Sequence, residues 1–340
     1  AGPGTHHGGH TVKSLELAHL TVDAGVKLLE SVGCTGTAKE MGKAVEEYRG
    51  HALTVKLLGN FIRVRHGGDI RKRDLLPSLS SERGDQAHGR RVMAAYERWF
   101  EQENSPELDV LRIMGLFDRP VEPGALEALK QKPDIPGVTE RLRKTSGETW
   151  RGALDRLREA CLLARTGTDA DESLDCHPLV REYFGRRLSG DNPNGWQAAH
   201  ERLYEYYKTV PGSETPDTLE EMEPLFAAVA HGCMAGKHQQ ALDDVFWKRI
   251  RRGNEAYIIH KLGAFGSDLS AVSHFFAEPW RQPAAGLNDN QKAGVLNWAA
   301  FGLRALGRLH EAVQPMEAGL VLREKQEKWK SAAINASNLS

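Results

Sequence analysis

Two stretches in the C-terminal half of the sequence share one spacing of small residues, and this spacing restricts that half to pairs of packed helices. Residues 226–246 and 298–320 each carry small residues, then a glycine, and four residues later Gln or Glu followed by Ala. The shared positions are Gly236 with Gln240 and Ala241, and Gly307 with Glu311 and Ala312. Glycine permits a tight turn between two helices, and alanine lets the helices approach closely. One pair buries too little apolar surface to be stable alone, so several pairs must stack.

This spacing resembles the middle of a tetratricopeptide repeat, a two-helix unit that stacks into a solenoid. Residues 192–208 open a helical pattern that continues beyond an irregular region at 247–292, and residues 329–340 are typical of the start of a further repeat helix. Stacked repeats expose a concave surface that binds proteins. We therefore expect a truncated helical repeat domain over 191–340, with a protein or peptide partner on the concave face of 220–340.

The N-terminal part is predicted to be a small helical bundle over 18–85. Thr21 is the expected N-cap of a first helix that stops at Gly33, and a second helix ends at Gly50. Residues 51–65 are strongly apolar and predict the central helix of this bundle. Each helix is too short to be stable alone, so the three must pack together.

Residues 86–190 are predicted to form a winged helix. Successive helical patterns are followed by residues 161–176, in which two period-two segments flank a turn rich in Gly and Asp and predict one short β-hairpin. A winged helix that reads DNA needs a basic recognition helix. Here the helix before the hairpin carries three arginines and three acids, and the predicted turn carries Asp169, Asp171 and Glu172. This charge balance argues against DNA reading by the winged helix. The fold class expected for the whole chain is mainly α-helical.

The composition excludes several classes of protein. Lys and Arg number 45 against 46 Asp and Glu, which argues against a dedicated nucleic-acid or membrane binder. A basic cluster within 63–91 is open to two interpretations, a solvated linker or a contact to phosphate or nucleic acid. The four cysteines are far apart in the sequence and predict reduced thiols in a cytoplasmic protein. No apolar run reaches the roughly 18 residues of a membrane span.

Motifs of catalysis and of metal binding are missing from the sequence. It contains no phosphate loop, no nucleophile elbow, no HExxH zinc motif and no EF-hand loop. Asp243 and Asp244 lie in a helical pattern and are expected on the surface. Cys176 and His177 are predicted on opposite faces of a strand, which is a poor geometry for a nucleophile and its base. We therefore expect this fragment not to be an enzyme and to bind no metal, with His6, His7 and His10 at most an adventitious site.

His177 lies between the predicted strand and a helix that begins at Pro178. The start of a helix favours anions, because its backbone N–H groups and dipole point outward there. An imidazole at this position can donate a hydrogen bond to a phosphate oxygen. The alternative is a structural histidine that caps the helix or satisfies a buried carbonyl.

A helical bundle, a winged helix and helical repeats in this order resemble the C-terminal part of the STAND class of signal-transduction ATPases, the NB-ARC-like group. In that family the bundle carries a Gly-x-Pro motif that packs on adenine. The matching stretch here is GHALTV, with Gly50 at the family glycine and Ala52 in place of the proline. The family's winged helix ends in Met-His-Asp, whose histidine contacts the nucleotide phosphate. CHPLVREY is similar to this motif and matches its histidine with His177.

The resemblance implies a nucleotide switch. His177 would clamp ADP in an off state, and a partner on the repeats would favour an open state that self-associates. Residues 1–17 would be the tail of an upstream nucleotide-binding domain that carries the phosphate loop and the magnesium-binding acids. ADP or ATP with magnesium would then belong to the parent protein, with no cofactor in this fragment alone.

Two other functions stay open at the level of the sequence. One is a nucleotide-independent scaffold in which winged helix and repeats serve only protein contacts. The other is a transcription regulator that places the basic segment 63–91 on DNA.

Overall fold

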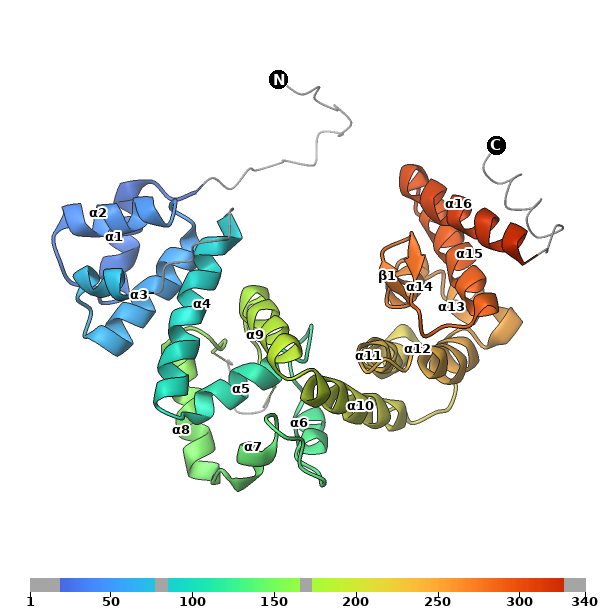
Figure 1. Cartoon of the computed structure of the whole chain (residues 1–340), viewed down its shortest axis with the longest axis horizontal. Helices are drawn as coiled ribbons and strands as arrows, with labels where there is room; N and C mark the ends of the chain where they lie inside the picture. The colour runs from blue at the N-terminus through green and yellow to red at the C-terminus, as the bar shows by residue number, and fades with distance from the viewer. Residues whose placement is uncertain (1–18, 77–84, 166–172, 327–340) are drawn as a thin grey trace, which may run out of the picture. The chain divides into compact units, whose positions relative to one another are not determined.

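The computed structural model describes residues 19–76, 85–165 and 173–326, and over these ranges the chain is mainly α-helical with one two-stranded antiparallel sheet (Figure 1). The predicted fold class is confirmed. The chain divides into two compact units. The described part of the first runs to residue 110 and adds 147–165 and 176–183, and the second takes 111–146, 173–175 and the described residues from 184 onward.

The first unit contains the predicted helical bundle. Its elements are α1 (Val22–Ser31), α2 (Ala38–Glu47), α3 (Ala52–His66), the 3₁₀ turn η1 (Ile70–Leu75), α4 (Asp85–Gln102), the start of α5 (Pro106–Met114), α8 (Gly147–Glu159) and the start of α9 (Pro178–Asp191). Thr21 caps α1 by accepting a hydrogen bond from the Ala24 N–H at 3.2 Å, as predicted. Leu29, Val45 and Leu58 are buried where α1, α2 and α3 meet.

An aromatic cluster fixes α4 against α3. The rings of Phe61 and Tyr96 meet edge to face, with centroids 5.0 Å apart. The buried Tyr96 hydroxyl donates to the carbonyl of Leu57 at 3.4 Å. Because a buried hydroxyl without a partner costs free energy, this bond specifies the depth at which α4 sits on α3.

The second unit holds the rest of the described chain. Its elements include α6 (Pro123–Leu129), α7 (Glu140–Lys144), α10 (Pro193–Thr209), α11 (Leu219–Met234), α12 (His238–Gln240), the π-helix η2 (Ala241–Ile250), η3 (Gly253–Glu255), α13 (Tyr257–His260), α14 (Phe265–Ser273), β1 (Phe276–Glu278), β2 (Gln282–Pro283), α15 (Asp289–Ala305) and α16 (Leu309–Lys325). No described helix combines the length and the apolarity needed to cross a membrane.

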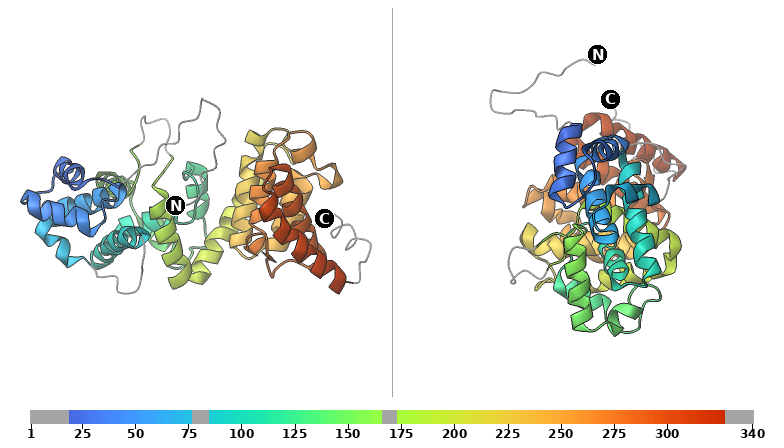
Figure 2. Two further views of the ribbon diagram at one scale, coloured as in Figure 1. Left: turned by 90° about the horizontal axis from the view of Figure 1, so that it is seen from above. Right: turned by 90° about the vertical axis from the view of Figure 1, so that its left-hand side faces the viewer.

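Both helix pairs predicted from the shared spacing are confirmed. α11 turns into α12 and η2 at Gly236, and α15 turns into α16 at Gly307, with φ of +76° and +72°. Ala241 and Ala312 are both buried. A Cβ atom on Gly232 would lie 2.9 Å from the Cβ of Ala241. A larger residue at position 232 would therefore push α11 and η2 apart. α15 and α16 lie side by side as a second pair (Figures 1 and 2).

The region 247–292 between these pairs, irregular in the sequence, is ordered in short elements. It contains η3, α13, α14 and the hairpin of β1 and β2, which pair through Phe276 with Pro283 and Glu278 with Gln282. α14 contacts both α11 and α15. It therefore provides the packing between the two helix pairs.

The hairpin predicted at 161–176 is wrong in its position. The described residues 161–165 form no strand, and Leu174 instead pairs with Val121 in an isolated antiparallel bridge. Cys161 has φ +56°, and the N–H groups of Leu162 and Leu163 both donate to Leu157 at the end of α8. Backbone groups that close a helix are not available to a strand ladder, which is why period-two patterning fails here. The predicted turn lies outside the described residues.

The predicted winged helix does not correspond to one compact unit. Of its residues 86–190, the segments 86–110, 147–165 and 176–183 belong to the first unit and the remainder to the second. The domain boundaries at 85 and 190 stay a prediction. The segment 1–17, expected to be the tail of an upstream domain, lies outside the described residues.

Candidate functional site

The three residues predicted to touch a nucleotide, Gly50, Ala52 and His177, all belong to the first unit. Ala52 is the first residue of α3, and Pro178 is the first residue of α9. A histidine precedes each of these helices, His51 before α3 and His177 before α9. The site therefore consists of two helix starts, each with a histidine at the position of the N-cap.

Both histidines cap their helices with the same ring atom. Nδ1 of His51 accepts from the Thr54 N–H at 3.3 Å and lies 3.0 Å from the Thr54 hydroxyl. Nδ1 of His177 accepts from the Leu179 N–H at 3.1 Å. A neutral ring that accepts at Nδ1 carries its proton on Nε2. The hydrogen bonds among the described residues leave Nε2 of both rings as a donor for a ligand.

The two rings are electrostatically coupled. Partial burial of the ring lowers the pKa of His177, and the neighbouring His51 lowers it further. His177 is therefore a neutral N–H donor near pH 7. His19 joins this group, with its ring centroid 6.0 Å from that of His51. An anion at His177 would accept a hydrogen bond from its ring and would favour its protonated form.

Gly50 has a structural role in the backbone that precedes α3. Its φ is +64°, and its carbonyl accepts from the Leu20 N–H at 2.8 Å. A Cβ atom at this position would lie 2.3 Å from the carbonyl oxygen of Leu20. This close approach of two backbones explains the glycine without any ligand.

Ala52 is exposed at the start of α3. His51 before it has φ −67° and ψ 110°, an extended conformation that is also allowed before proline. The geometry would therefore accept the proline that the resemblance expects at this position.

The start of α9 is held against α4 within the first unit. A Cβ atom on the buried Gly89 of α4 would lie 2.7 Å from Cδ2 of Leu179, so the two helices are in direct contact there. Arg90 lies 3.4 Å from the carboxylate of Glu182, and the Tyr183 hydroxyl donates to Glu97 at 2.6 Å. These contacts keep His177 at a fixed position relative to the bundle.

The basic cluster within 63–91 is largely engaged within the first unit. Its arginines contact acids or a carbonyl oxygen: Arg63 with the carbonyl of Glu159, Arg65 with Glu103, Arg71 with Asp69, Arg73 and Arg91 with Glu47, and Arg90 with Glu182. A guanidinium already paired with a carboxylate has less to gain from a phosphate. Most guanidinium groups of the cluster are therefore engaged within the first unit, which argues against an open basic surface.

The remaining sequence candidates are placed as follows. Cys176 is buried and His177 is exposed, in agreement with the predicted opposite faces. Asp244 is exposed as predicted, but Asp243 is half-buried and accepts from Gln239 at 2.6 Å and from Gln291 at 2.7 Å. His6, His7 and His10 lie outside the described residues, and within those residues no group of three His, Cys, Asp or Glu could hold a metal.

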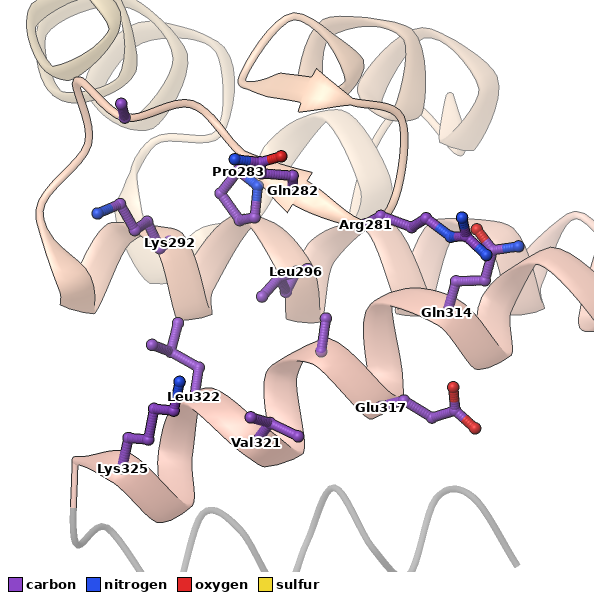
Figure 3. A pocket seen from close by; sticks show the side chains of 12 residues that line it. Arg281, Gln282, Pro283, Lys292, Leu296, Gln314, Glu317, Val321, Leu322 and Lys325 are labelled. Atoms are coloured by element: carbon purple, nitrogen blue, oxygen red, sulfur yellow. The ribbon is translucent and has the colours of Figure 1, made fainter.

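A groove of about 620 Å³ lies within the predicted partner region 220–340. It is formed by α15, α16 and the segment around β2 (Figure 3). Its lining residues are Arg281, Gln282, Pro283, Ala285, Lys292, Leu296, Gln314, Glu317, Ala318, Val321, Leu322 and Lys325. Residues 281–285 fall in the stretch that has no repeat pattern, so the spacing of small residues gave no signal for this side of the groove.

The comparisons with known proteins assign no family. No protein-family model and no curated protein match the sequence. Among solved structures, the chain is similar to the crystal structure of a Signal Transduction ATPase with Numerous Domains (STAND) protein with a tetratricopeptide repeat sensor from Pyrococcus horikoshii, at 17% identity and a TM-score of 0.41. The match covers 98% of this chain and 46% of that chain, so this chain spans less than half of that protein's length. At this identity and TM-score the match assigns no function to the chain.

Proposed function

We propose that this chain is the regulatory and sensor part of a nucleotide-switched signalling ATPase. The first unit would bind the phosphates of ADP or ATP between the starts of α3 and α9, and the repeats of the second unit would bind a protein partner. The chain itself would not hydrolyse ATP, since its sequence holds no phosphate loop for the nucleotide. Magnesium and the hydrolytic groups would belong to an upstream domain of the parent protein.

The observation that carries this proposal is the pair of histidine-capped helix starts. α3 and α9 are 15 and 14 residues long, so each start lies at the positive end of a full helix dipole. His51 lies near enough to His177 to lower its pKa, and each ring, since it accepts at Nδ1, carries its proton on Nε2. Two such starts with imidazole donors suit a diphosphate better than a neutral ligand.

The direct test is the protonation of His177 in the presence of ADP. Imidazole nitrogen shifts of the ¹⁵N-labelled chain, followed against pH with and without millimolar ADP, give the pKa of each ring. Bound phosphate is expected to raise the pKa of His177 by about 1, because an adjacent anion favours imidazolium. Shifts of His177 that do not respond to ADP or to ATP would contradict the proposal.

A matched pair of variants separates phosphate binding from helix capping. Asparagine is a good N-cap, so His177→Asn is expected to keep α9 capped while it removes the Nε2 donor. His177→Ala removes both functions. Loss of ADP binding in both variants, measured by calorimetric titration, with melting temperature lowered only in His177→Ala, supports a phosphate contact. ADP binding that survives in His177→Asn would show that the histidine is only a cap.

A nucleotide-independent scaffold is the second candidate, and the groove on α15 and α16 favours it, because a partner site there does not need the first unit. Partner binding that is unaffected by ADP, together with absent ADP binding, would support this alternative. The engaged arginines of the cluster within 63–91 argue against the third candidate, a transcription regulator.

A further inference from the structure

The groove on the last helix pair has its charges at two ends and its apolar residues between them. Lys292 and Lys325 lie together at one end, and Arg281 lies at the other (Figure 3). Leu296 and Val321 lie between the two ends, and Leu322 lies beside the lysines. The antiparallel course of α15 and α16 explains this arrangement, because the start of α15 meets the end of α16.

Cations outnumber carboxylates in the lining. Three basic side chains face the groove, and Glu317 beside Gln314 at the Arg281 end is the one carboxylate among its lining residues. Lys292 also contacts Asp289 at 3.4 Å, but the Asp289 side chain is 72% exposed, and such a solvated pair contributes little free energy. The lining is therefore net positive at the lysine end, whereas at the other end the cation Arg281 lies on the same side as Glu317.

We propose that this groove binds a protein segment in which apolar residues are flanked on both sides by acidic residues. The apolar side chains would cover Leu296 and Val321, and the flanking carboxylates would pair with Arg281 at one end and with Lys325 at the other. Charges that stand at the two ends of a groove between helices match an extended or helical segment rather than a compact ligand. This proposal rests on the partner-binding half of the proposed function and names the chemistry of the partner.

The first experiment selects peptides without prior choice of sequence. A display library of random dodecapeptides is panned against the 340-residue chain. Enriched peptides are expected to carry Asp or Glu on both sides of an apolar centre. Enrichment of basic or uncharged peptides, or no enrichment above background, overturns the proposal.

The second experiment places the selected peptide in this groove. Fluorescence anisotropy with the most enriched peptide is expected to give a dissociation constant about tenfold higher in the double variant Arg281→Glu and Lys325→Glu. Lys261→Glu reverses one charge, half the change of the double variant, on an exposed lysine outside the groove lining and is expected to change affinity less than about twofold. Equal affinity for the double variant and the wild type overturns the assignment.

A reciprocal charge exchange excludes an indirect effect of the double variant. A peptide whose acidic residues are replaced by lysine is expected to bind the double variant better than the wild type. Circular dichroism melting curves establish that both variants are folded. Concentration-dependent dimerisation of the chain that Arg281→Glu abolishes would show that a second copy occupies the groove, and it would overturn the proposal.

The peptide-binding proposal and the nucleotide-binding proposal can be rejected independently of each other. The panning and anisotropy measurements are made without nucleotide, and the ADP titration of His177 is made without peptide. A chain that binds ADP but no acidic peptide loses only the partner proposal. A chain that binds the peptide but not ADP retains the groove and becomes a scaffold.

Discussion

The two helix pairs of the second unit carry the same spacing of small residues but bury different surfaces. Six residues after the turn glycine, the first pair places Leu242 at 1% exposure and the second places Val313 at 40%. Fourteen residues after the glycine, Ile250 is 0% exposed and Val321 is 51% exposed. The first pair packs against α10 and α14, whereas the second has α14 on one side and no described helix on the other. The spacing thus determines the pair, and the neighbours determine which of its apolar residues are buried.

The largest expected effect is a difference between truncations at equivalent positions. Leu242→Ala should lower the free energy of unfolding by about 2–5 kcal/mol, because it leaves a cavity in a packed interior. Val313→Ala should change it by less than about 0.5 kcal/mol, since its side chain is largely exposed. Urea titrations followed by circular dichroism measure both. Equal losses at the two positions would show that the second pair is covered in solution.

The second effect is an acid sensitivity at the contact between α10 and the first pair. His200 on α10 and His231 on α11 are buried with their Nδ1 atoms 2.8 Å apart, and burial lowers the pKa of His200 to about 3 and that of His231 well below its usual value. The unfolded chain binds protons at about 6.5, so stability is lost as pH falls below that value. His200 is expected to cost about 2 kcal/mol between pH 6.5 and pH 5, and His231 acts in the same direction.

Asp268 on α14 acts in the opposite direction. Burial raises the pKa of this carboxyl to about 6, so its stabilising contribution is present at low pH and is lost as pH rises through 6. It therefore offsets part of the loss due to the histidines. His200→Gln should weaken the pH dependence of the urea midpoint between neutral pH and pH 5. A wild-type midpoint that does not change over this interval would contradict the assignment.

The third effect should be the same in both pairs. Gly236→Ala and Gly307→Ala each place a Cβ atom on a left-handed residue, at φ +76° and +72°. No atom lies within 3.4 Å of that Cβ in either case, so only backbone strain of about 1 kcal/mol is expected. The matched losses are measured by thermal melting. A loss twice as large in one pair would mean that its turn has a further constraint.

The sequence predicts a feature well when the residues that form it are close together along the chain, and poorly when they are far apart. The helix pairs were predictable because a turn glycine and an alanine five residues later act within one hairpin. The hydrogen bond between Asp243 and Gln291 was not predictable, because the two residues are 48 positions apart and neither belongs to a recognisable sequence motif. Cys161 defeated the predicted hairpin because a left-handed non-glycine residue leaves no reliable sequence signal.

The candidate nucleotide site combines residues that the resemblance selected with one that it missed. The resemblance selected Gly50, Ala52 and His177, and the structure places all three in the first unit. His51 was missed, because histidine is not among the residues preferred at N-caps. A histidine immediately before each of two helices was the available signal. Whether these residues bind a nucleotide stays a prediction.

The two histidine-capped helices also share one sequence pattern but differ in the residue that follows the histidine. Their comparison gives the smallest expected effect. His177 is followed by Pro178 as the first residue of α9, whereas His51 is followed by Ala52 as the first residue of α3. Proline is favoured at this position, because its fixed φ suits a helix and the missing N–H has no intrahelical partner. Ala52→Pro should therefore raise the free energy of unfolding by about 0.4–1 kcal/mol through the lower entropy of the unfolded chain.

The reciprocal substitution, Pro178→Ala, should lower the free energy of unfolding by a similar amount. Thermal melting of the two variants and of the wild type measures both changes, and a destabilised Ala52→Pro variant would show that the start of α3 cannot accept the ring. ADP binding then separates two roles of the proline. If Ala52→Pro stabilises the fold and leaves ADP binding unchanged, a proline at this position sets the helix start, whereas tighter ADP binding would indicate a direct contact with the nucleotide.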